Sequence, residues 1–160
     1  TISKLEVQKK NIEKEIERII KARSVTTKNV KLDTAVLKLG KFQRPISGTI
    51  VVKFREKKNG EVVSNGIEIA GKMGTRVKAA TSGKVIYADK FQGLNNVVMV
   101  DYGYNTIGVY GNLIAVGVKL NQQVQRGQDI GVLGLNTDSK ANLYYEVRFN
   151  LKPINPENLF

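Results

Sequence analysis

NLYYEVRFN, residues 142–150, is the stretch that decides the fold. If it is an extended strand, successive side chains point to opposite faces. One face then carries Leu143, Tyr145, Val147 and Phe149, and the other carries Asn142, Tyr144, Glu146 and Arg148. The apolar face predicts a core, and the row of polar and aromatic groups is a candidate binding surface. Because alternation is also the ordinary pattern of a half-buried strand with a solvated face, the neighbouring sequence has to decide between the two.

Similar short runs of β-branched and aromatic residues recur between residues 42 and 160. Turn residues such as Ser82-Gly83 and Gly127 separate them, as expected between strands. The runs lie at residues 48–54, 66–70, 75–80, 83–89, 95–103, 105–113, 129–134 and 142–149. We therefore expect a mainly β domain over residues 42–160.

Residues 1–22 have a different period. Apolar residues follow each other at spacings of three and four, with Glu and Lys between them, which is the pattern of an amphipathic helix with a coiled-coil seam. The seam residues are Ile2, Leu5, Ile12, Ile16 and Ile19. We interpret this segment as the end of a coiled coil, and residues 23–41, where no period is sustained, as a connecting arm that is part helical. The start at Thr1 instead of Met suggests a processed or truncated piece.

The composition of the chain excludes several classes of function. The 160 residues include 26 Lys and Arg against 14 Asp and Glu, a net charge of +12, which favours anionic surfaces. We expect no nucleic-acid partner, because the cations are spread along the chain and no nucleic-acid-binding motif is present. Histidine and cysteine are absent, which excludes disulfides and most hydrolase and zinc chemistry.

Four segments of the β region, in order and spacing, resemble the peptidase domain of LytM-type zinc endopeptidases of the bacterial cell wall. They are residues 64–89, 97–113, 124–134 and 142–160. The resemblance implies a LytM-like sheet and barrel-sandwich fold with a long groove across one sheet. It also implies a zinc ion on the groove floor and the cross-linking peptides of peptidoglycan as substrate.

The family's catalytic pattern can be carried over position by position. Its His-x-Gly-x-Asp motif falls on Ser64, Gly66 and Glu68, and a further histidine falls on Asn112. Its His-Leu-His-Phe-Glu motif falls on residues 142–146, which read Asn-Leu-Tyr-Tyr-Glu. Glu68 is the one carboxylate left at the ligand positions, and a single carboxylate does not hold catalytic zinc. We therefore expect no catalytic residue, no metal and no cofactor.

Histidine-free domains of this kind resemble the degenerate LytM factors. The order of coiled coil, arm and degenerate domain resembles that of EnvC-type activators of cell-wall amidases. This resemblance implies that the groove binds an N-acetylmuramoyl-L-alanine amidase during cell separation and that the arm covers the groove beforehand. It also implies contact between the coiled coil and a division-site membrane complex, and a periplasmic or cell-envelope location.

The predicted partner-binding groove is formed by Tyr144, Arg148, Tyr110, Asn112, Asn142, Ser64 and Glu68. Aromatic and arginine side chains are common interface anchors, so we expect Tyr144→Ala and Arg148→Glu to weaken partner binding and leave folding intact. In the alternative interpretation, Tyr144 fills the vacated metal cavity and Arg148 pairs with a nearby acid.

Two other functions stay open at this point. One is a structural module that binds peptidoglycan through the same groove. The other is a biotinyl or lipoyl carrier, suggested by the GKMG sequence at residues 71–74, for which an intact mass would reveal the attached group.

Overall fold

The computed structural model describes residues 3–58 and 62–160, so Ile2 of the predicted seam lies outside the described residues. The predicted helix begins at Lys4, and the arm contains a second, short helix. The elements, in chain order, are α1 Lys4–Arg23, α2 Leu32–Leu39, β1 Ile50–Val52, β2 Lys57–Lys58, β3 Val62–Val63, β4 Ile67–Ala70, β5 Arg76–Lys78, β6 Gly83–Phe91, β7 Asn95–Gly103, β8 Thr106–Val116, β9 Gln123–Val124, β10 Asp129–Leu133, β11 Asn142–Phe149, β12 Lys152–Ile154 and the 3-10 helix η1 Pro156–Leu159.

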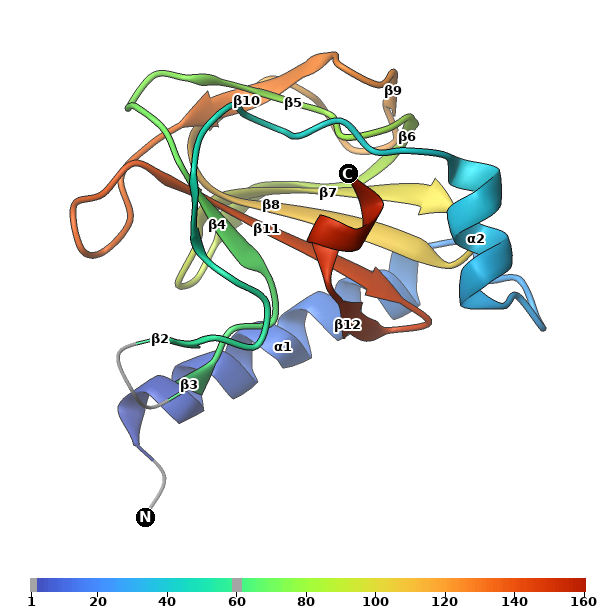
Figure 1. Cartoon of the computed structure of the whole chain (residues 1–160), viewed down its shortest axis with the longest axis horizontal. Coiled ribbons are helices and arrows are strands. Elements are labelled where there is room, and N and C mark those ends of the chain that lie inside the picture. The colour runs from blue at the N-terminus through green and yellow to red at the C-terminus, as the bar shows by residue number, and fades with distance from the viewer. Residues whose placement is uncertain (1–2, 59–61) are drawn as a thin grey trace.

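The strands form a large antiparallel sheet, which confirms the mainly β fold expected from the sequence. Among the described residues, ten strands belong to it, and its main path runs β1-β4-β11-β8-β7-β6-β9. Strand β10 pairs with both β5 and β8, so β5 and β10 fold over one face of the sheet (Figure 1). Strand β12 pairs antiparallel with the end of β11, and β2 and β3 form a separate two-stranded ribbon.

Side chains alternate between two apolar clusters, one on each face of the central strands. On β7, Val98 and Val100 belong to the first cluster, which the strands β5 and β10 enclose, whereas Val97 and Met99 belong to the second. Strand β11 follows the same rule, with Tyr145 in the first cluster and Tyr144 packed against the second. The alternation predicted for residues 142–149 is therefore confirmed.

Helix α1 covers the second cluster. Ser3 caps its N-terminus by accepting a hydrogen bond from the Glu6 N–H at 3.2 Å. The helix lies along the lower side of the sheet in Figure 1 and contributes three fully or nearly fully buried side chains, Ile16, Ile19 and Ile20. Ile16 and Ile19 of the predicted seam are thus buried against the chain's own sheet, and Ile12 packs against the same cluster. The coiled coil itself stays a prediction.

Hydrogen bonds tie the arm to β7 and to the turn between β7 and β8. The Val25 N–H donates to Asp101 at 3.0 Å, and the Thr27 N–H donates to Asn105 at 2.8 Å. After α2, the Phe42 N–H donates to the Leu159 carbonyl at 2.7 Å. The described helices include none with the length and apolar character needed to cross a bilayer.

Candidate functional site: the covered groove

Strand β11 is the floor of the candidate site. It lies between β4 and β8, and Tyr144 is in register with Glu68 on one side and with Gly111 on the other. The approach of β4 is close, because a Cβ atom added to Gly66 would stand 2.5 Å from the Tyr145 carbonyl oxygen. Glycine at position 66 therefore lets β4 bring Ser64 and Glu68 alongside Tyr144.

Hydrogen bonds join several of the positions where the family has histidines. The Asn142 side-chain amide donates to Glu68 at 3.4 Å, and the Asn112 amide donates to the Asn142 carbonyl at 3.0 Å. Ser64 Oγ donates to the Gly66 carbonyl at 2.8 Å. Asn112 has a φ of +68°, a left-handed conformation that asparagine tolerates better than most residues. These groups hold the strand ends together.

A second set of polar contacts runs along the groove face of β11. The Tyr144 hydroxyl donates to one oxygen of Glu146, and Arg148 Nε donates to the other. Glu146 is 1% exposed and Arg148 is 2% exposed. Burial and the neighbouring Glu146 carboxylate raise the pKa of Tyr144 well above its usual value, so the phenol stays neutral.

Arg148 is not fully satisfied by these contacts. Its Nη1 donates to the Leu151 carbonyl at 3.0 Å and lies 3.7 Å from the carboxylate of Glu17 on α1. Its Nη2 atom is buried and makes no hydrogen bond within the described part of the chain. A buried guanidinium with one free donor group is a candidate anchor for an additional acceptor.

Helix α1 lies over this face. Toward the N-terminal half of the helix, the Asn65 side-chain amide donates to Glu13, while Glu17 reaches Arg148. Ile16, between these two acids, is fully buried in the second cluster. Helix α1 therefore covers the predicted partner-binding groove, whereas the resemblance implied that residues 23–41 cover it.

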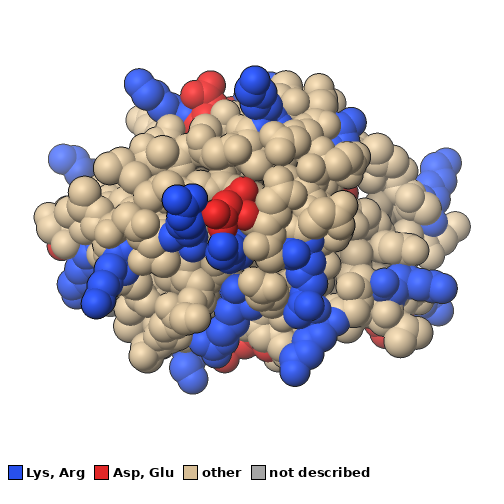
Figure 2. Space-filling model, turned by 90° about the horizontal axis from the view of Figure 1, so that it is seen from above, with Lys and Arg blue, Asp and Glu red and all other residues tan. Residues whose placement is uncertain are grey.

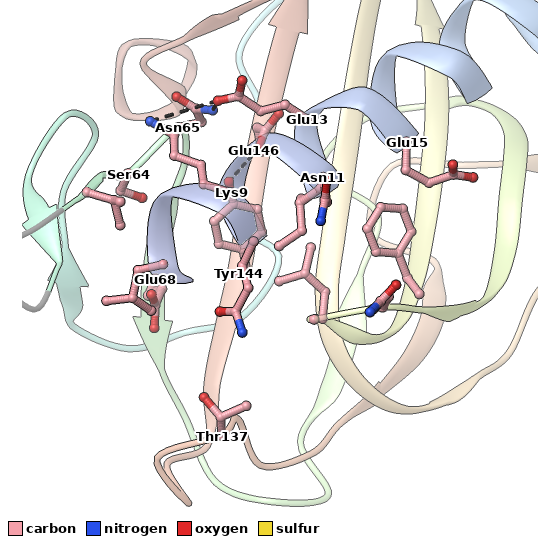
Figure 3. A pocket seen from close by; sticks show the side chains of 18 of the residues that line it. Lys9, Asn11, Glu13, Glu15, Ser64, Asn65, Glu68, Thr137, Tyr144 and Glu146 are labelled. Carbon is pink, nitrogen blue, oxygen red and sulfur yellow. Dashed lines mark hydrogen bonds and ion pairs between the residues drawn. The ribbon is translucent and has the colours of Figure 1, made fainter. Parts of the chain in front are cut away.

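A pocket of about 740 Å³ remains between the first half of α1 and strands β3, β4 and β11. Figure 3 shows Tyr144 in the middle of this pocket, with Ser64 and Glu68 on one side and Asn11 of α1 on the other. The contact between Glu13 and Asn65 lies above Tyr144 in this view. Residues of α1 between Leu5 and Glu15 form one wall of this pocket.

The structure brings only part of the predicted site together. Ser64, Glu68 and Tyr144 line the pocket, and Arg148 lies under α1 on the same face. Tyr110 lies on the opposite face: it is fully buried in the first cluster, and its hydroxyl accepts a hydrogen bond from the Ala80 N–H at 2.9 Å. The placement of Tyr110 on the groove face is therefore wrong, because its ring is part of the core.

The two acidic residues through which α1 contacts the sheet were not predicted from the sequence. Glu13 and Glu17 are four residues apart on α1, so they point to the same side of the helix, and both reach polar groups of the sheet. Asn65 was also missed. The spacing of the two acids beside the buried isoleucines is the signal that could have indicated a docked helix.

The donor set does not fit the zinc ion that the fold family implies. Asparagine and serine are poor zinc ligands, and the Tyr144 hydroxyl is neutral and bonded to Glu146. Among residues 3–58 and 62–160, no group of three or more Asp, Glu, His or Cys side chains is arranged to hold a metal ion. The side chains at these positions are engaged in hydrogen bonds, Asn142 with Glu68 and both Ser64 and Asn112 with backbone carbonyls.

Comparison with known proteins assigns the family. The model of peptidase family M23 matches residues 62–156, which is more than half of the chain. The chain belongs to peptidase family M23. Murein hydrolase activator EnvC of Escherichia coli (strain K12) is 33% identical over 114 residues, covering 71% of this chain and 27% of that protein. The lipoprotein NlpD/LppB homolog of Pseudomonas aeruginosa is 33% identical over 119 residues, covering 74% of this chain and 39% of that protein.

The fold agrees with these relatives. A solved structure of a putative peptidase M23 from Pseudomonas aeruginosa has a TM-score of 0.67 at 25% identity and covers 92% of this chain and 59% of that chain. The chain has no histidine, and the positions onto which the family's histidines were carried hold Ser64, Asn112, Asn142 and Tyr144. The chain spans less than half the length of the two curated relatives.

Proposed function

We propose that this M23 domain is a non-catalytic activator of a cell-wall N-acetylmuramoyl-L-alanine amidase, which it binds through the groove face of β11 and β4. The observation that carries the proposal is the helix already on that face. Isoleucines of α1 fill the apolar part of the groove, and Glu17 stands beside the buried Arg148. A face that holds one amphipathic helix has the shape and charge to hold another.

The names of the relatives support this function. EnvC of Escherichia coli is a murein hydrolase activator by name, and so is NlpD of Salmonella dublin, which is 26% identical over 134 residues and covers 83% of this chain. Since these names and that of a lipoprotein belong to envelope proteins, we place this chain in the periplasm or cell envelope. Contact of its N-terminal segment with a division-site membrane complex stays a prediction.

In this proposal α1 is the resting cover of the groove. An amidase helix that binds the same face has to displace α1. The observed affinity is therefore lower than the intrinsic affinity, in proportion to the fraction of molecules in which α1 is detached. The incoming helix needs aliphatic side chains at the places of Ile16 and Ile19 and an acid near Arg148. The buried Nη2 of Arg148 leaves room for one more hydrogen bond to that acid.

A reversible cross-link tests the cover. The chain has no cysteine, so Glu13→Cys with Asn65→Cys places the only two thiols where the native side chains touch. A bis-maleimide with a reducible linker then fixes α1 to the sheet. We expect the cross-linked protein to give no dye release from labelled peptidoglycan by purified amidases of the source organism, and the reduced protein to restore it.

The matched control carries Lys10→Cys and Lys14→Cys, two exposed positions one helical turn apart that bridge only α1 itself. Its cross-linked form should stimulate the amidase as well as its reduced form does. Full stimulation by the Glu13–Asn65 cross-linked protein would refute the cover. No stimulation by any form with any amidase would refute the activator function.

The alternative function is a structural module that binds peptidoglycan directly. The pocket beside Tyr144 favours it, because a pocket of about 740 Å³ lined by Glu68, Asn65 and Thr137 could hold a short polar peptide. Co-sedimentation with purified peptidoglycan in the absence of amidase separates the two. Binding that is lost in Tyr144→Ala, together with absent amidase stimulation, would favour the wall-binding module.

A further inference from the structure

The arm exposes aliphatic side chains that the fold leaves uncovered. Leu37 is 80% exposed and Val25 is 72% exposed, and Leu32 and Val36 are also exposed. All four lie within 13 residues of each other along the chain. Isolated exposed aliphatics are ordinary, but three of these four lie on the short helix α2 and Val25 lies ahead of it in the same arm, so together they form a candidate contact surface.

Exposed lysines are interspersed with these aliphatic residues along the arm. Lys28, Lys31, Lys38 and Lys41 are all exposed, whereas Asp33 is the one carboxylate in residues 21–41. Figure 1 places α2 at the right-hand edge of the molecule, and Figure 2 shows Lys and Arg side chains at that end with few acidic ones among them. The four exposed aliphatics and these four lysines are named the arm surface.

The arm surface is held in place by the domain. Ala35 is 1% exposed, and Leu39 packs against the first cluster, so one side of α2 is fixed to the core. Ahead of the helix, the Thr27 carbonyl accepts a hydrogen bond from Asn105 at 2.7 Å. Because the inward side is taken by Ala35 and Leu39, Leu37 on the opposite side of the helix projects away from the protein.

We propose that the arm surface binds the anionic headgroup surface of a phospholipid bilayer. Lysines next to projecting aliphatics match such a surface: the ammonium groups meet phosphates while the aliphatic side chains enter the boundary of the acyl chains. The arm surface includes α2 at the edge of the molecule (Figure 1), and none of its residues lines the pocket beside Tyr144, so a flat, extended partner fits it better than a small ligand. Reversible attachment to the bilayer would set the orientation of the groove relative to the membrane.

Co-sedimentation of the full chain with lipid vesicles tests the proposal. We expect binding to vesicles of phosphatidylglycerol mixed with phosphatidylcholine and little binding to phosphatidylcholine alone. Binding should weaken between 0.15 M and 1 M salt, where the screening length falls from about 8 Å to about 3 Å. Lys31→Glu with Lys38→Glu should weaken it by more than about tenfold, given roughly fivefold for each lysine near an anionic surface.

Leu37→Asp separates the apolar contribution from the charge. It should weaken vesicle binding by about tenfold or more through lost apolar burial and through the added negative charge. The matched controls lie in the turns after β4 and before β11, on the side of the molecule away from α2 (Figure 1), where the Gly71 N–H donates to the Ala141 carbonyl. They are Lys72→Glu with Lys140→Glu for the charge change and Leu135→Asp for the aliphatic change, all at exposed positions.

These controls should bind vesicles within about twofold of the unsubstituted chain, since the change in net charge is the same but lies away from the arm surface. Circular dichroism checks that each variant is folded. Absent binding to anionic vesicles overturns the proposal, as does equal binding to phosphatidylcholine alone or an equal loss in the Lys72 and Lys140 control. If Leu37→Asp impairs amidase or peptidoglycan binding and leaves vesicle binding unchanged, the arm surface is a protein or wall contact and the proposal is wrong.

Discussion

Ile19→Ala is the substitution that should uncover the groove. Ile19 is fully buried between α1 and the sheet. Shortening a buried isoleucine to alanine costs about 2 to 5 kcal/mol, and here the loss falls on the docked state of the helix. If α1 detaches as a unit, the detached fraction rises by about 30-fold to several thousand-fold.

The effect of the larger detached fraction can be measured as amidase affinity and as amidase stimulation. Apparent affinity for the amidase should rise with the detached fraction until detachment is no longer limiting. Titration of the amidase by isothermal calorimetry gives the affinity, and dye release at limiting activator gives the activity. We expect Ile19→Ala to bind more tightly and to stimulate at lower concentration than the unsubstituted chain does.

The control is Ile130→Ala. Ile130 is also fully buried, but it lies in the first cluster on the other face of the sheet. It should lower the free energy of unfolding by a similar amount without raising amidase affinity. Unchanged affinity in Ile19→Ala, despite a lowered unfolding midpoint, would refute the idea that α1 competes with the partner. An equal gain in Ile130→Ala would mean that general destabilisation produces the effect.

Three further outcomes can be checked on the purified chain. Burial raises the pKa of Tyr110 from its ordinary 10 to about 12. Stability should therefore be unchanged below pH 10 and fall between pH 10 and 12, where Tyr110 of the unfolded state ionises first, with a slope of about 1.4 kcal/mol per pH unit. Equal urea midpoints at pH 9 and pH 12 would contradict this. Arg148→Glu faces the buried Glu146 and should lower the free energy of unfolding in urea by about 3 to 5 kcal/mol, against less than about 0.5 kcal/mol for the exposed control Arg126→Glu. Metal analysis after dialysis against zinc should find well below one zinc ion per chain, because the donors at the family's ligand positions do not fit the ion; one tightly held zinc would contradict this.

The destabilisation expected for Arg148→Glu replaces the expectation, drawn from the sequence, that this substitution leaves folding intact. Alternation along residues 142–149 correctly placed Arg148 on the groove face, but it gave no measure of burial. In the folded chain Arg148 is 2% exposed and carries the bonds to Glu146 and Leu151. Arg148→Glu is therefore a test of stability, and Glu17→Gln on the half-exposed helix is the milder way to weaken the same contact.

The strands were predictable because the alternation of residues within each short segment shows which side chains share a face. The runs expected at residues 95–103 and 142–149 coincide with β7 and β11. Tyr110 was misplaced because the partners of its hydroxyl, Ala80 and Tyr102, belong to segments that the fold brings together from elsewhere in the chain. Local periodicity indicates which side chains share a face, but the assignment of that face to core or groove depends on such distant contacts.

The same limit applies to α1, and it bears on how the groove could work. A seam of isoleucines three and four residues apart suits a partner helix and a sheet equally well, so the sequence could not choose between them. In the folded chain the helix packs on the sheet, where Ile16, Ile19 and Ile20 are buried. At about 1.5 to 3 kcal/mol for each buried side chain, these three contribute roughly 5 to 9 kcal/mol, which is comparable with the whole stability of a typical domain.

A groove that loses this much apolar contact cannot stay empty at low cost. Detachment of α1 would expose Met99, Val109 and Phe91 on the sheet together with the isoleucines of the helix. We therefore expect the amidase helix to replace α1 in a direct exchange, with each new apolar contact offsetting one that is lost. The net affinity then depends on the difference between the two helices, and that difference lies where α1 fits least well: at Arg148, whose buried Nη2 lacks an acceptor within the described residues. A partner acid that reaches this atom would make a bond that Glu17, at 3.7 Å from Nη1, does not make.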